Sequence, residues 1–215
     1  MTNPFEYFLS YKVLKWQTPE ISIDTKDICQ QWQMDLVYFD FIAFTGNGGF
    51  FFDGALQLYD LGDTKNCNNI LLVNTKLVEA FGEIFSGLFS FGQDIFGNQF
   101  VFDQLNNQIS VFNIEDGSRT PVAKSFAEWL VEFTADLDYF SGWSYQKQYT
   151  EKYELPIENR IVPIKPFVIQ GAFTIDNFFD TAFPEYIIYN ADIAKQIFHL
   201  EEGKPVKLIL GSRKQ

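Results

Sequence analysis

The sequence predicts an α+β fold: a single domain built around an antiparallel-rich mixed sheet that is backed by helices on one side. Aromatic residues alternate with other residues between positions 89 and 112, a pattern typical of strands. An amphipathic helical pattern follows this stretch directly. Hydrophobic residues make up 47% of the 215 residues, so the chain can bury one substantial core.

The N-terminal part of the chain is predicted to form two helices and a hairpin. Asp24 is a suitable N-cap for a helix that ends near Trp32. The apolar stretch Met34–Phe44 is predicted as a second helix, which ends at a Gly-Asn-Gly-Gly turn. Phe50–Phe52 and Ala55–Tyr59 are expected to pair as a hairpin around the intervening Asp-Gly sequence.

The middle of the chain is predicted to contain a helix between strands. Ile70–Val73 is expected to be a short buried strand, and Asn74 or Thr75 is expected to cap a helix that runs to about Phe85. Three aromatic strands are expected to follow it, over Phe89–Phe91, Gln99–Phe102 and Gln108–Phe112.

A second amphipathic helix is predicted after these strands. Pro121 lies where the first turn of a helix tolerates proline. Phe126, Trp129, Leu130 and Phe133 recur at i, i+3, i+4 and i+7, which places them on one helical face. We therefore predict that Trp129 belongs to the core.

The last third of the chain gives weaker patterns. Residues 141–165 are polar and carry two prolines, so we expect a connecting arm there. The remaining elements are expected to be Phe167–Ile169, a turn at Gly171, a helix near Asn190–Leu200 and a strand over Val206–Leu210.

The negative charge is confined to one part of the sequence. The net charge is −12, and residues 1–140 hold 19 Asp and Glu against 7 Lys and Arg, whereas residues 141–215 hold 9 of each. Such a field repels nucleic acid and anionic membranes and attracts basic partners, although solubility alone explains it equally well. The acidic loops give five candidate partner-binding residues: Asp60, Asp63, Asp94, Glu115 and Asp116.

No residue pattern indicates catalysis, a cofactor or a metal. His199 is the single histidine, and the sequence contains no G-x-S-x-G motif. Gly46–Gly49 has no Lys or Arg within ten residues, so a turn is expected rather than a phosphate loop. Asp60, Asp63 and Asn66 lack the spacing of a calcium loop and are interpreted as a solvated acidic loop. A catalytic carboxylate pair stays open, because no spacing singles out two of the 28 Asp and Glu.

The sequence favours a cytoplasmic location. Cys29 and Cys67 are isolated, which indicates neither a disulfide framework nor a redox motif. The N-terminus lacks the features of a signal peptide, and no apolar stretch approaches the length that spans a membrane.

Four ordered segments resemble the SUKH superfamily, which includes a yeast cell-wall-assembly regulator and bacterial immunity proteins. They are Thr45–Tyr59, Phe91–Asp103, Val111–Gly117 and Ala123–Leu130, within residues 37–133. The tail from Pro166 resembles a C-terminal extension of some bacterial members. The resemblance implies a SUKH-like acidic domain over residues 1–140, with residues 141–215 packed on it as an extension.

The resemblance also implies a function. Bacterial members are typically cytoplasmic immunity proteins that bind and neutralise a cognate toxin, and the family supplies no shared catalytic residues. A basic toxin domain is therefore the expected partner, with no nucleic-acid or membrane partner. The alternatives are a regulatory or scaffold adaptor of the cell-wall-regulator type and a carboxylate-dependent hydrolase. The absence of long flexible flanks favours the immunity protein over the adaptor.

Overall fold

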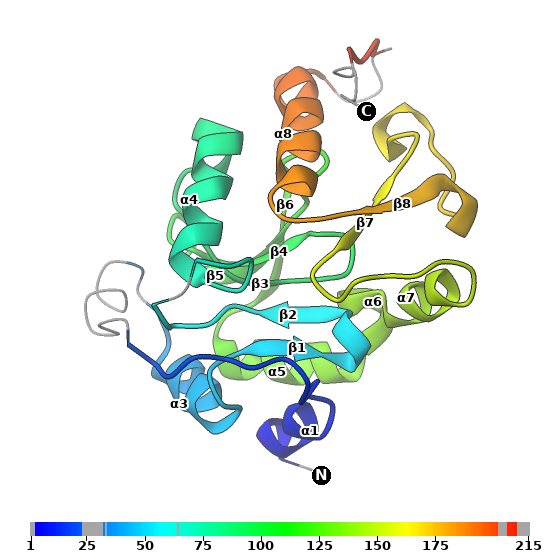
Figure 1. The fold of residues 1–215 in the computed structure, drawn as a ribbon. Helices are drawn as coiled ribbons and strands as arrows, with labels where there is room; N and C mark the ends of the chain where they lie inside the picture. Colours follow the sequence, from blue (N-terminus) through cyan, green and yellow to red (C-terminus); the bar gives the residue numbers. More distant parts are fainter. Residues whose placement is uncertain (1–2, 23–31, 33, 64, 202–205, 210–215) are drawn as a thin grey trace.

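A six-stranded sheet forms the centre of the computed structural model, which describes residues 3–22, 32, 34–63, 65–201 and 206–209 (Figure 1). Its strands lie side by side in sequence order: β1 Gly49–Phe51, β2 Leu56–Leu58, β3 Leu88–Gln93, β4 Gln99–Asp103, β5 Gln108–Phe112 and β6 Arg119–Ala123. Every pairing between these described strands is antiparallel. The predicted α+β class is confirmed, and a parallel bridge between Asp60 and Asn69 lies outside the named strands.

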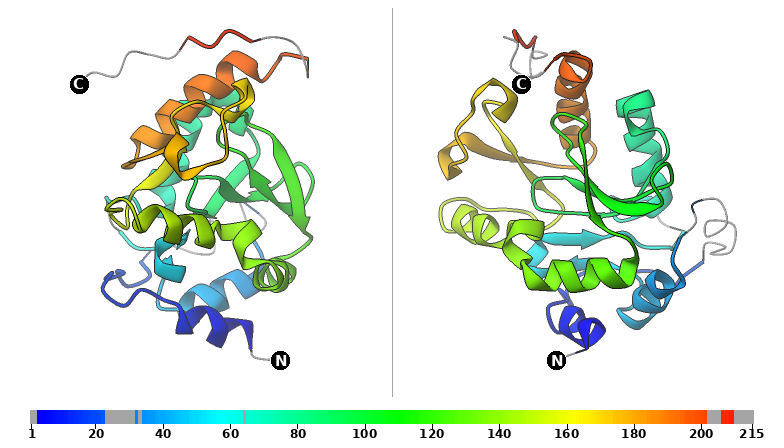
Figure 2. Two further views of the ribbon diagram at one scale, coloured as in Figure 1. Left: turned by 90° about the vertical axis from the view of Figure 1, so that its right-hand side faces the viewer. Right: turned by 180° about the vertical axis from the view of Figure 1, so that it is seen from behind.

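Helices cover both faces of this sheet, which corrects the expectation of helices on one side. Helices α1 (Pro4–Ser10), α3 (Leu36–Phe44) and α5 (Phe126–Ala135) lie on one face, and α4 (Ile70–Phe81) and α8 (Glu185–Ile197) on the other (Figure 1). The view from behind shows α5 running below the strands (Figure 2). Both faces are buried because side chains alternate across each strand, and here both sets meet helices.

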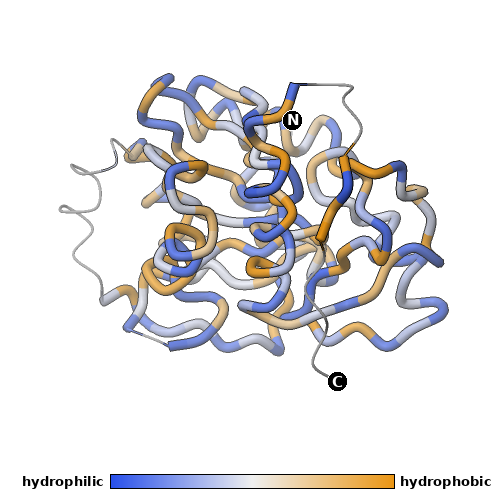
Figure 3. The backbone as a smooth tube through the Cα atoms, turned by 90° about the horizontal axis from the view of Figure 1, so that it is seen from above, coloured by the Kyte–Doolittle hydropathy of each residue, from blue (hydrophilic) through white to orange (hydrophobic). Residues whose placement is uncertain are grey.

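The face toward α5 is an aromatic core. Trp129 of α5 is fully buried, and its ring lies 5.1 Å from Phe91 and 5.2 Å from both Phe100 and Phe126. Phe8 of α1 joins this cluster by packing 5.2 Å from Phe133. The prediction that Trp129 belongs to the core is confirmed. Seen from above, hydrophobic and hydrophilic residues alternate along the backbone, as expected for elements with one buried side (Figure 3).

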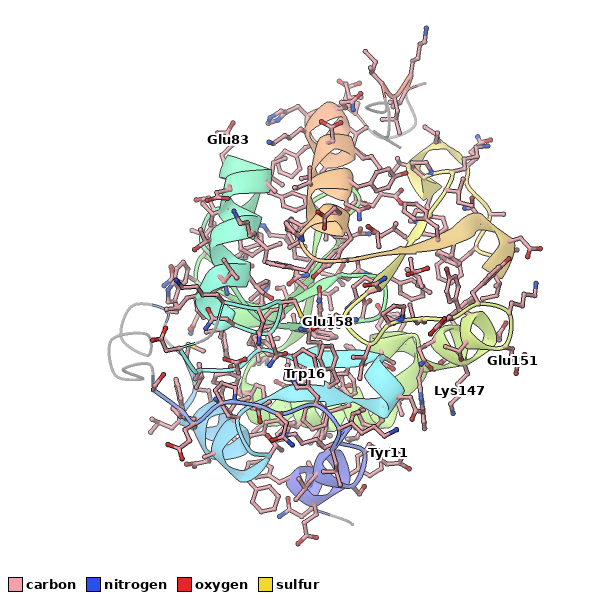
Figure 4. The ribbon with its side chains drawn as sticks, viewed as in Figure 1. Tyr11, Trp16, Glu83, Lys147, Glu151 and Glu158 are labelled. Carbon is pink, nitrogen blue, oxygen red and sulfur yellow. The ribbon has the colours of Figure 1, made fainter. Side chains whose placement is uncertain are left out.

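The first edge of the sheet is covered by the segment that follows α1. The Val13 amide donates to the Phe50 carbonyl at 2.8 Å, and the Phe52 amide donates to the Tyr11 carbonyl at 3.0 Å. Trp16, labelled in Figure 4, packs edge-on against Phe50 with ring centroids 4.8 Å apart. This segment therefore adds backbone hydrogen bonds and apolar contact to β1.

The loop between α3 and β1 is a turn, as predicted. Gly46, Gly48 and Gly49 all have positive φ, which suits glycine. The Lys12 ammonium donates to the carbonyls of Thr45 and Gly46, at 2.6 and 2.9 Å. The contact between Lys12 and this turn could not be predicted from sequence spacing, because Lys12 lies in the segment after α1, far from the turn in the chain.

Two predictions about secondary structure are wrong in the middle of the chain. Ile70–Val73 is the first turn of α4, because Asn69 caps the helix by accepting a hydrogen bond from the Leu72 amide at 2.8 Å. A short apolar run is compatible with either a buried strand or a helix.

Pro121 lies in β6, where an edge strand tolerates it, and α5 begins later with Ser125 as its N-cap.

The predicted connecting arm at residues 141–165 is also wrong. It contains α7 (Trp143–Thr150), which follows α6 (Leu137–Ser141), and β7 (Arg160–Pro163), which pairs with β8 (Phe178–Thr181). Phe167–Ile169 is a short 3-10 helix, and α8 begins five residues before the predicted Asn190.

Two predicted elements extend beyond the described residues. No strand forms over residues 206–209 of the predicted Val206–Leu210, and Leu210 lies outside the described ranges. The predicted Asp24–Trp32 helix also lies outside them, apart from Trp32 itself.

The C-terminal segments pack on the same core as the sheet. The Ile161 amide of β7 donates to the Ile95 carbonyl at 3.0 Å, and α8 contacts α4. Tyr186 and Ile187 of α8 are fully buried. The division of the chain at residue 140 stays a prediction.

Candidate partner-binding surface

The structure separates the five predicted contact residues into two groups. Asp60, Asp94 and Glu115 are buried, with 0%, 6% and 6% of their surface exposed. Asp63 is exposed and Asp116 is half-buried. Of the five, only the last two therefore present a carboxylate at the surface, and a role for them in binding stays a prediction.

Asp60 organises the loop after β2 from inside. Its Oδ1 accepts from the Gly62 amide at 3.0 Å, and its Oδ2 accepts from Asn68 Nδ2 at 3.1 Å. Its own amide donates to the Asn68 carbonyl at 2.6 Å. The interpretation of this segment as a solvated acidic loop is therefore wrong for Asp60, because a buried carboxylate is retained where backbone and amide donors satisfy it.

Asp94 holds the β3–β4 turn in a similar way. Its Oδ1 accepts from the amides of Phe96 and Asn98, at 2.9 and 2.8 Å, and its Oδ2 accepts from Asn98 Nδ2 at 2.8 Å. Burial raises the pKa of Asp94 to about 7, although these hydrogen bonds oppose the shift. Asp94 thus shapes a turn.

The strongest exposed charge asymmetry lies on helices instead of loops. Helices α1, α3, α5 and α6 lie wholly within the described residues and contain no Lys or Arg. Six exposed carboxylates decorate these helices and the α5–α6 junction: Glu6, Asp40, Glu128, Glu132, Asp136 and Asp138. We call this surface the acidic helical face. Its helices are neighbours, since α5 contacts α1, α3 and α6.

Exposed apolar side chains share the acidic helical face. Leu36 and Phe44 of α3 are 75% and 46% exposed, and Val131 of α5 is 55% exposed. Tyr139 of α6 is 68% exposed. Apolar and aromatic side chains set among charged groups are typical of protein-contact surfaces.

The helices on the opposite face of the sheet carry both signs of charge. Lys76 and Glu79 of α4 form an ion pair at 2.7 Å, and α8 presents Asp192 and Lys195. Glu83, in the 3-10 helix Gly82–Phe85 that follows α4, points away from the molecule (Figure 4). A long-range field for a basic partner is therefore stronger over the acidic helical face.

Buried polar side chains fill the sheet face beneath α8. A row of glutamine side chains crosses β2, β3 and β4, formed by Gln57, Gln93 and Gln99. Gln93 Nε2 donates to Gln57 Oε1 at 2.7 Å, and Gln99 Nε2 donates to Gln93 Oε1 at 2.9 Å. Gln93 also donates to the Tyr186 hydroxyl of α8 at 2.8 Å. Arg160 of β7 is fully buried and donates to Gln57 Oε1.

This glutamine row connects the C-terminal segments to the sheet. Arg160 also donates to the carbonyls of Asn159 and Ile157, at 2.6 and 3.2 Å, and it forms no ion pair among the described residues. The guanidinium therefore donates only to neutral acceptors among the described residues, while its charge also acts on the Asp94 carboxylate. No local sequence pattern reveals this cluster, because its members are far apart in the chain. They come together only through the pairing of the strands and the docking of β7.

The groups considered for chemistry show no catalytic arrangement. Burial raises the pKa of the Cys67 thiol to about 11, which disfavours the reactive thiolate. His199 is exposed beyond the end of α8. Within the described ranges, no three His, Cys, Asp or Glu are grouped so that they could hold a metal ion. Among the described helices, none has the length and apolar character needed to cross a bilayer.

One sequence signal pointed to the acidic helical face. Glu128 and Glu132 are four residues apart on α5, and Asp136 follows four residues later as the C-cap of that helix, so all three exposed carboxylates lie outside the buried stripe that contains Trp129. The five predicted contact residues were chosen from the acidic loops and not from this helical spacing. In a folded chain, however, loop carboxylates are often turned inward to cap turns.

Comparison with known proteins identifies a family. The model of the SMI1 / KNR4 family (SUKH-1) matches residues 25–132. The crystal structure of Atu4351 from Agrobacterium tumefaciens is similar in fold, with a TM-score of 0.54 and 16% identity over 84% of each chain. No curated protein matches the chain significantly.

Proposed function

Since this chain belongs to the SMI1/KNR4 family (SUKH-1), we propose that it is a non-enzymatic binding protein that neutralises a cognate toxin by direct contact. The observation that carries the proposal beyond the family is the acidic helical face, with its six exposed carboxylates and no Lys or Arg in its helices. A basic protein domain complements that surface in charge. The expected setting is the bacterial cytoplasm.

Neutralisation by such a surface needs no chemical step. A toxin that acts on nucleic acid binds phosphates through Lys and Arg. The acidic helical face offers carboxylates to the same cations and apolar contact through Leu36, Phe44 and Val131. Binding there would cover the toxin's substrate surface, and neither nucleic acid nor a membrane would compete well for an acidic protein.

A titration tests the proposal. A candidate toxin domain, identified from the genes that neighbour this one, would be assayed for activity while the purified protein is added in increasing amounts. We expect activity to fall linearly and to vanish near equimolar protein, because each molecule blocks one toxin molecule. Size-exclusion chromatography should then show the two proteins in one complex.

The shape of the titration also separates a binder from an enzyme. Loss of toxin activity at strongly substoichiometric protein would indicate catalytic modification and overturn the non-enzymatic assignment. Full toxin activity in the presence of excess, folded protein would overturn the neutralising role. Atu4351 is a suitable control protein, because it shares the fold at only 16% identity.

A further inference from the structure

Four parts of the chain line a pocket of about 250 Å³, which meets the acidic helical face at Tyr139 of α6. The β3–β4 turn contributes Asp94 and Phe96, and the β5–β6 turn contributes Glu115. The C-terminal segments contribute Phe173 and Asn190. The pocket therefore exists only because residues after 141 pack against the sheet.

The Glu115 carboxylate lies against the backbone of Phe167 and Val168, whose amides favour its ionised form. Its Oε1 accepts a hydrogen bond from the Val168 amide at 2.8 Å. Its Oε2 is buried and has no hydrogen-bond partner among the described residues. An acceptor of this kind is costly to bury, because water has been removed and nothing replaces it.

Asn190 supplies a second unused acceptor to the same pocket. Its Nδ2 donates to the Tyr186 carbonyl at 2.8 Å, which fixes the amide, while its Oδ1 is buried without a partner among the described residues. Asn190 is 1% exposed and Glu115 is 6% exposed. Two residues that line the pocket thus each hold a buried oxygen that lacks a hydrogen-bond donor among the described residues.

The remaining walls select against an anion. Asp94 lines the pocket, and no Lys, Arg or His from the described residues does. Phe96 and Phe173 lie 5.4 Å apart, and Phe167 lies 5.0 Å from Phe173. Phe173, which also lines the pocket, is 46% exposed. Aromatic rings beside carboxylates attract cations through their quadrupole.

From this geometry we propose that the pocket binds an organic monocation, either an alkylammonium or a guanidinium group. Such a group donates several hydrogen bonds, has one positive charge and carries an apolar stem that suits aromatic walls. A divalent metal fits less well, since the described residues do not group three His, Cys, Asp or Glu around any point. The inference goes beyond toxin neutralisation and does not depend on it.

Proton exchange supports the same ligand class. Burial raises the pKa of Glu115 to about 7, and Asp116 raises it further by repulsion. Asp94 and Tyr139 are the other titratable groups at the pocket. A bound cation favours the ionised carboxylate, so binding should release protons and weaken below pH 7.

Calorimetry with n-butylammonium chloride tests the proposal, with 1-butanol as the neutral probe of similar size. We expect the wild-type protein to bind the ammonium at pH 8 and to bind 1-butanol at least about tenfold more weakly, as a charge-assisted hydrogen bond predicts. The Glu115→Gln variant should lose about tenfold in ammonium affinity.

Asp116→Asn is the matched control, because it removes the same charge from the neighbouring residue, which does not line the pocket. We expect that variant to bind n-butylammonium within about twofold of wild type, since the half-buried Asp116 lies outside the pocket and solvent partly screens its charge. Equal losses in the two variants, or equal binding of n-butylammonium and 1-butanol, would overturn the site.

A second variant keeps the test decisive if Glu115→Gln perturbs the fold. Phe173→Leu removes one aromatic wall and should lower ammonium affinity by about two- to fivefold, with 1-butanol binding unchanged. Unchanged ammonium affinity in Phe173→Leu would contradict the aromatic contribution.

N-acetyl-lysine methylamide and N-acetyl-norleucine methylamide then distinguish the two sources of the cation. Preference for the lysine derivative over n-butylammonium identifies a protein side chain as the natural ligand, and the reverse identifies a free amine. Either outcome supports the site, whereas binding of neither cation overturns it.

Discussion

The two faces of the central sheet are both buried, but they are held together by different forces. Toward α5, Trp129, Phe91 and Phe100 interlock as rings. Toward α8, Gln57 and Arg160 belong to a hydrogen-bonded row. Dispersion and water exclusion tolerate small shifts in position, whereas hydrogen bonds in a dry site require defined partners. The aromatic face is therefore held by close packing of rings, and the polar face specifies where the C-terminal segments dock.

Truncating the centre of the aromatic face should have the largest effect. Trp129→Ala should lower the free energy of unfolding by about 3–5 kcal/mol, because it empties a fully enclosed site. Urea unfolding measures this value. Val131→Ala, on the exposed side of the same helix, is the control and should change stability by less than about 0.5 kcal/mol. A loss below about 1 kcal/mol in Trp129→Ala would contradict its place in the core.

Breaking the polar face should have an asymmetric effect. Gln57→Leu should cost about 3 kcal/mol, because it leaves the buried Arg160 guanidinium short of an acceptor. Arg160→Met removes the charge itself and should cost less, about 1–3 kcal/mol. The double variant should lose less free energy of unfolding than the sum of the losses in the two single variants. Additive losses in urea unfolding would show that the two side chains do not depend on each other.

The pH dependence of stability probes the junction between the polar face and the C-terminal segments. The folded-state pKa of Glu115 is raised to about 7 from a reference of 4.5, so the folded protein holds this proton more tightly. Stability should therefore fall as pH rises from 4.5 to 7 and then level off.

Glu115→Gln should remove this contribution. We expect a gain on the order of 2 kcal/mol at pH 8 and almost none at pH 4, where the carboxyl group is neutral in both states. Asp94 shifts in the same direction, but it is present in both proteins and cancels in the difference. An equal gain at both pH values would show that the effect does not come from ionisation.

Charge reversal on the acidic helical face should leave both sheet faces intact. Asp40 and Glu132 are exposed, so Asp40→Lys/Glu132→Lys should change folding stability by less than about 1 kcal/mol. It should slow association with a basic toxin about tenfold and flatten the salt dependence of the on-rate. Stopped-flow mixing across a salt series measures both quantities.

The control reverses the same number of charges on the other side of the molecule, as Glu83→Lys/Asp192→Lys. An equal slowing in the control would mean that net charge alone steers the partner. Asp63→Lys/Asp116→Lys tests the exposed Asp63 and the half-buried Asp116 of the loops in the same assay, with an expected slowing of about twofold.

The aromatic face was predictable from sequence, and the polar face was not. Phe126, Trp129 and Phe133 lie within one helix, so their spacing alone reveals a buried stripe. Gln57, Gln93 and Arg160 come from three separate segments, and each is a residue type that is normally exposed. Their burial depends on strand register and on the docking of β7, neither of which leaves a local signal.

The candidate contact surface shows the same limit. Asp60 and Glu115 belong to acidic loop sequences, and nothing near them in the chain distinguishes a capped, buried carboxylate from a solvated one. The acidic side of α5 was encoded locally, by Glu128, Glu132 and Asp136. Helical periodicity is thus the more reliable guide to exposed charge, because it fixes which residues oppose the core.

The two margins of the sheet limit the ways in which another chain can bind. At β1, the segment around Val13 already occupies the backbone hydrogen-bonding positions, and at β6, Pro121 interrupts the row of amide donors. Unpaired strand margins are the usual route by which chains polymerise into fibres or recruit extended peptides. With both margins of this sheet obstructed, a partner that binds the sheet must be recognised through side chains. Surface substitutions can then change which partner binds without exposing a strand margin for polymerisation.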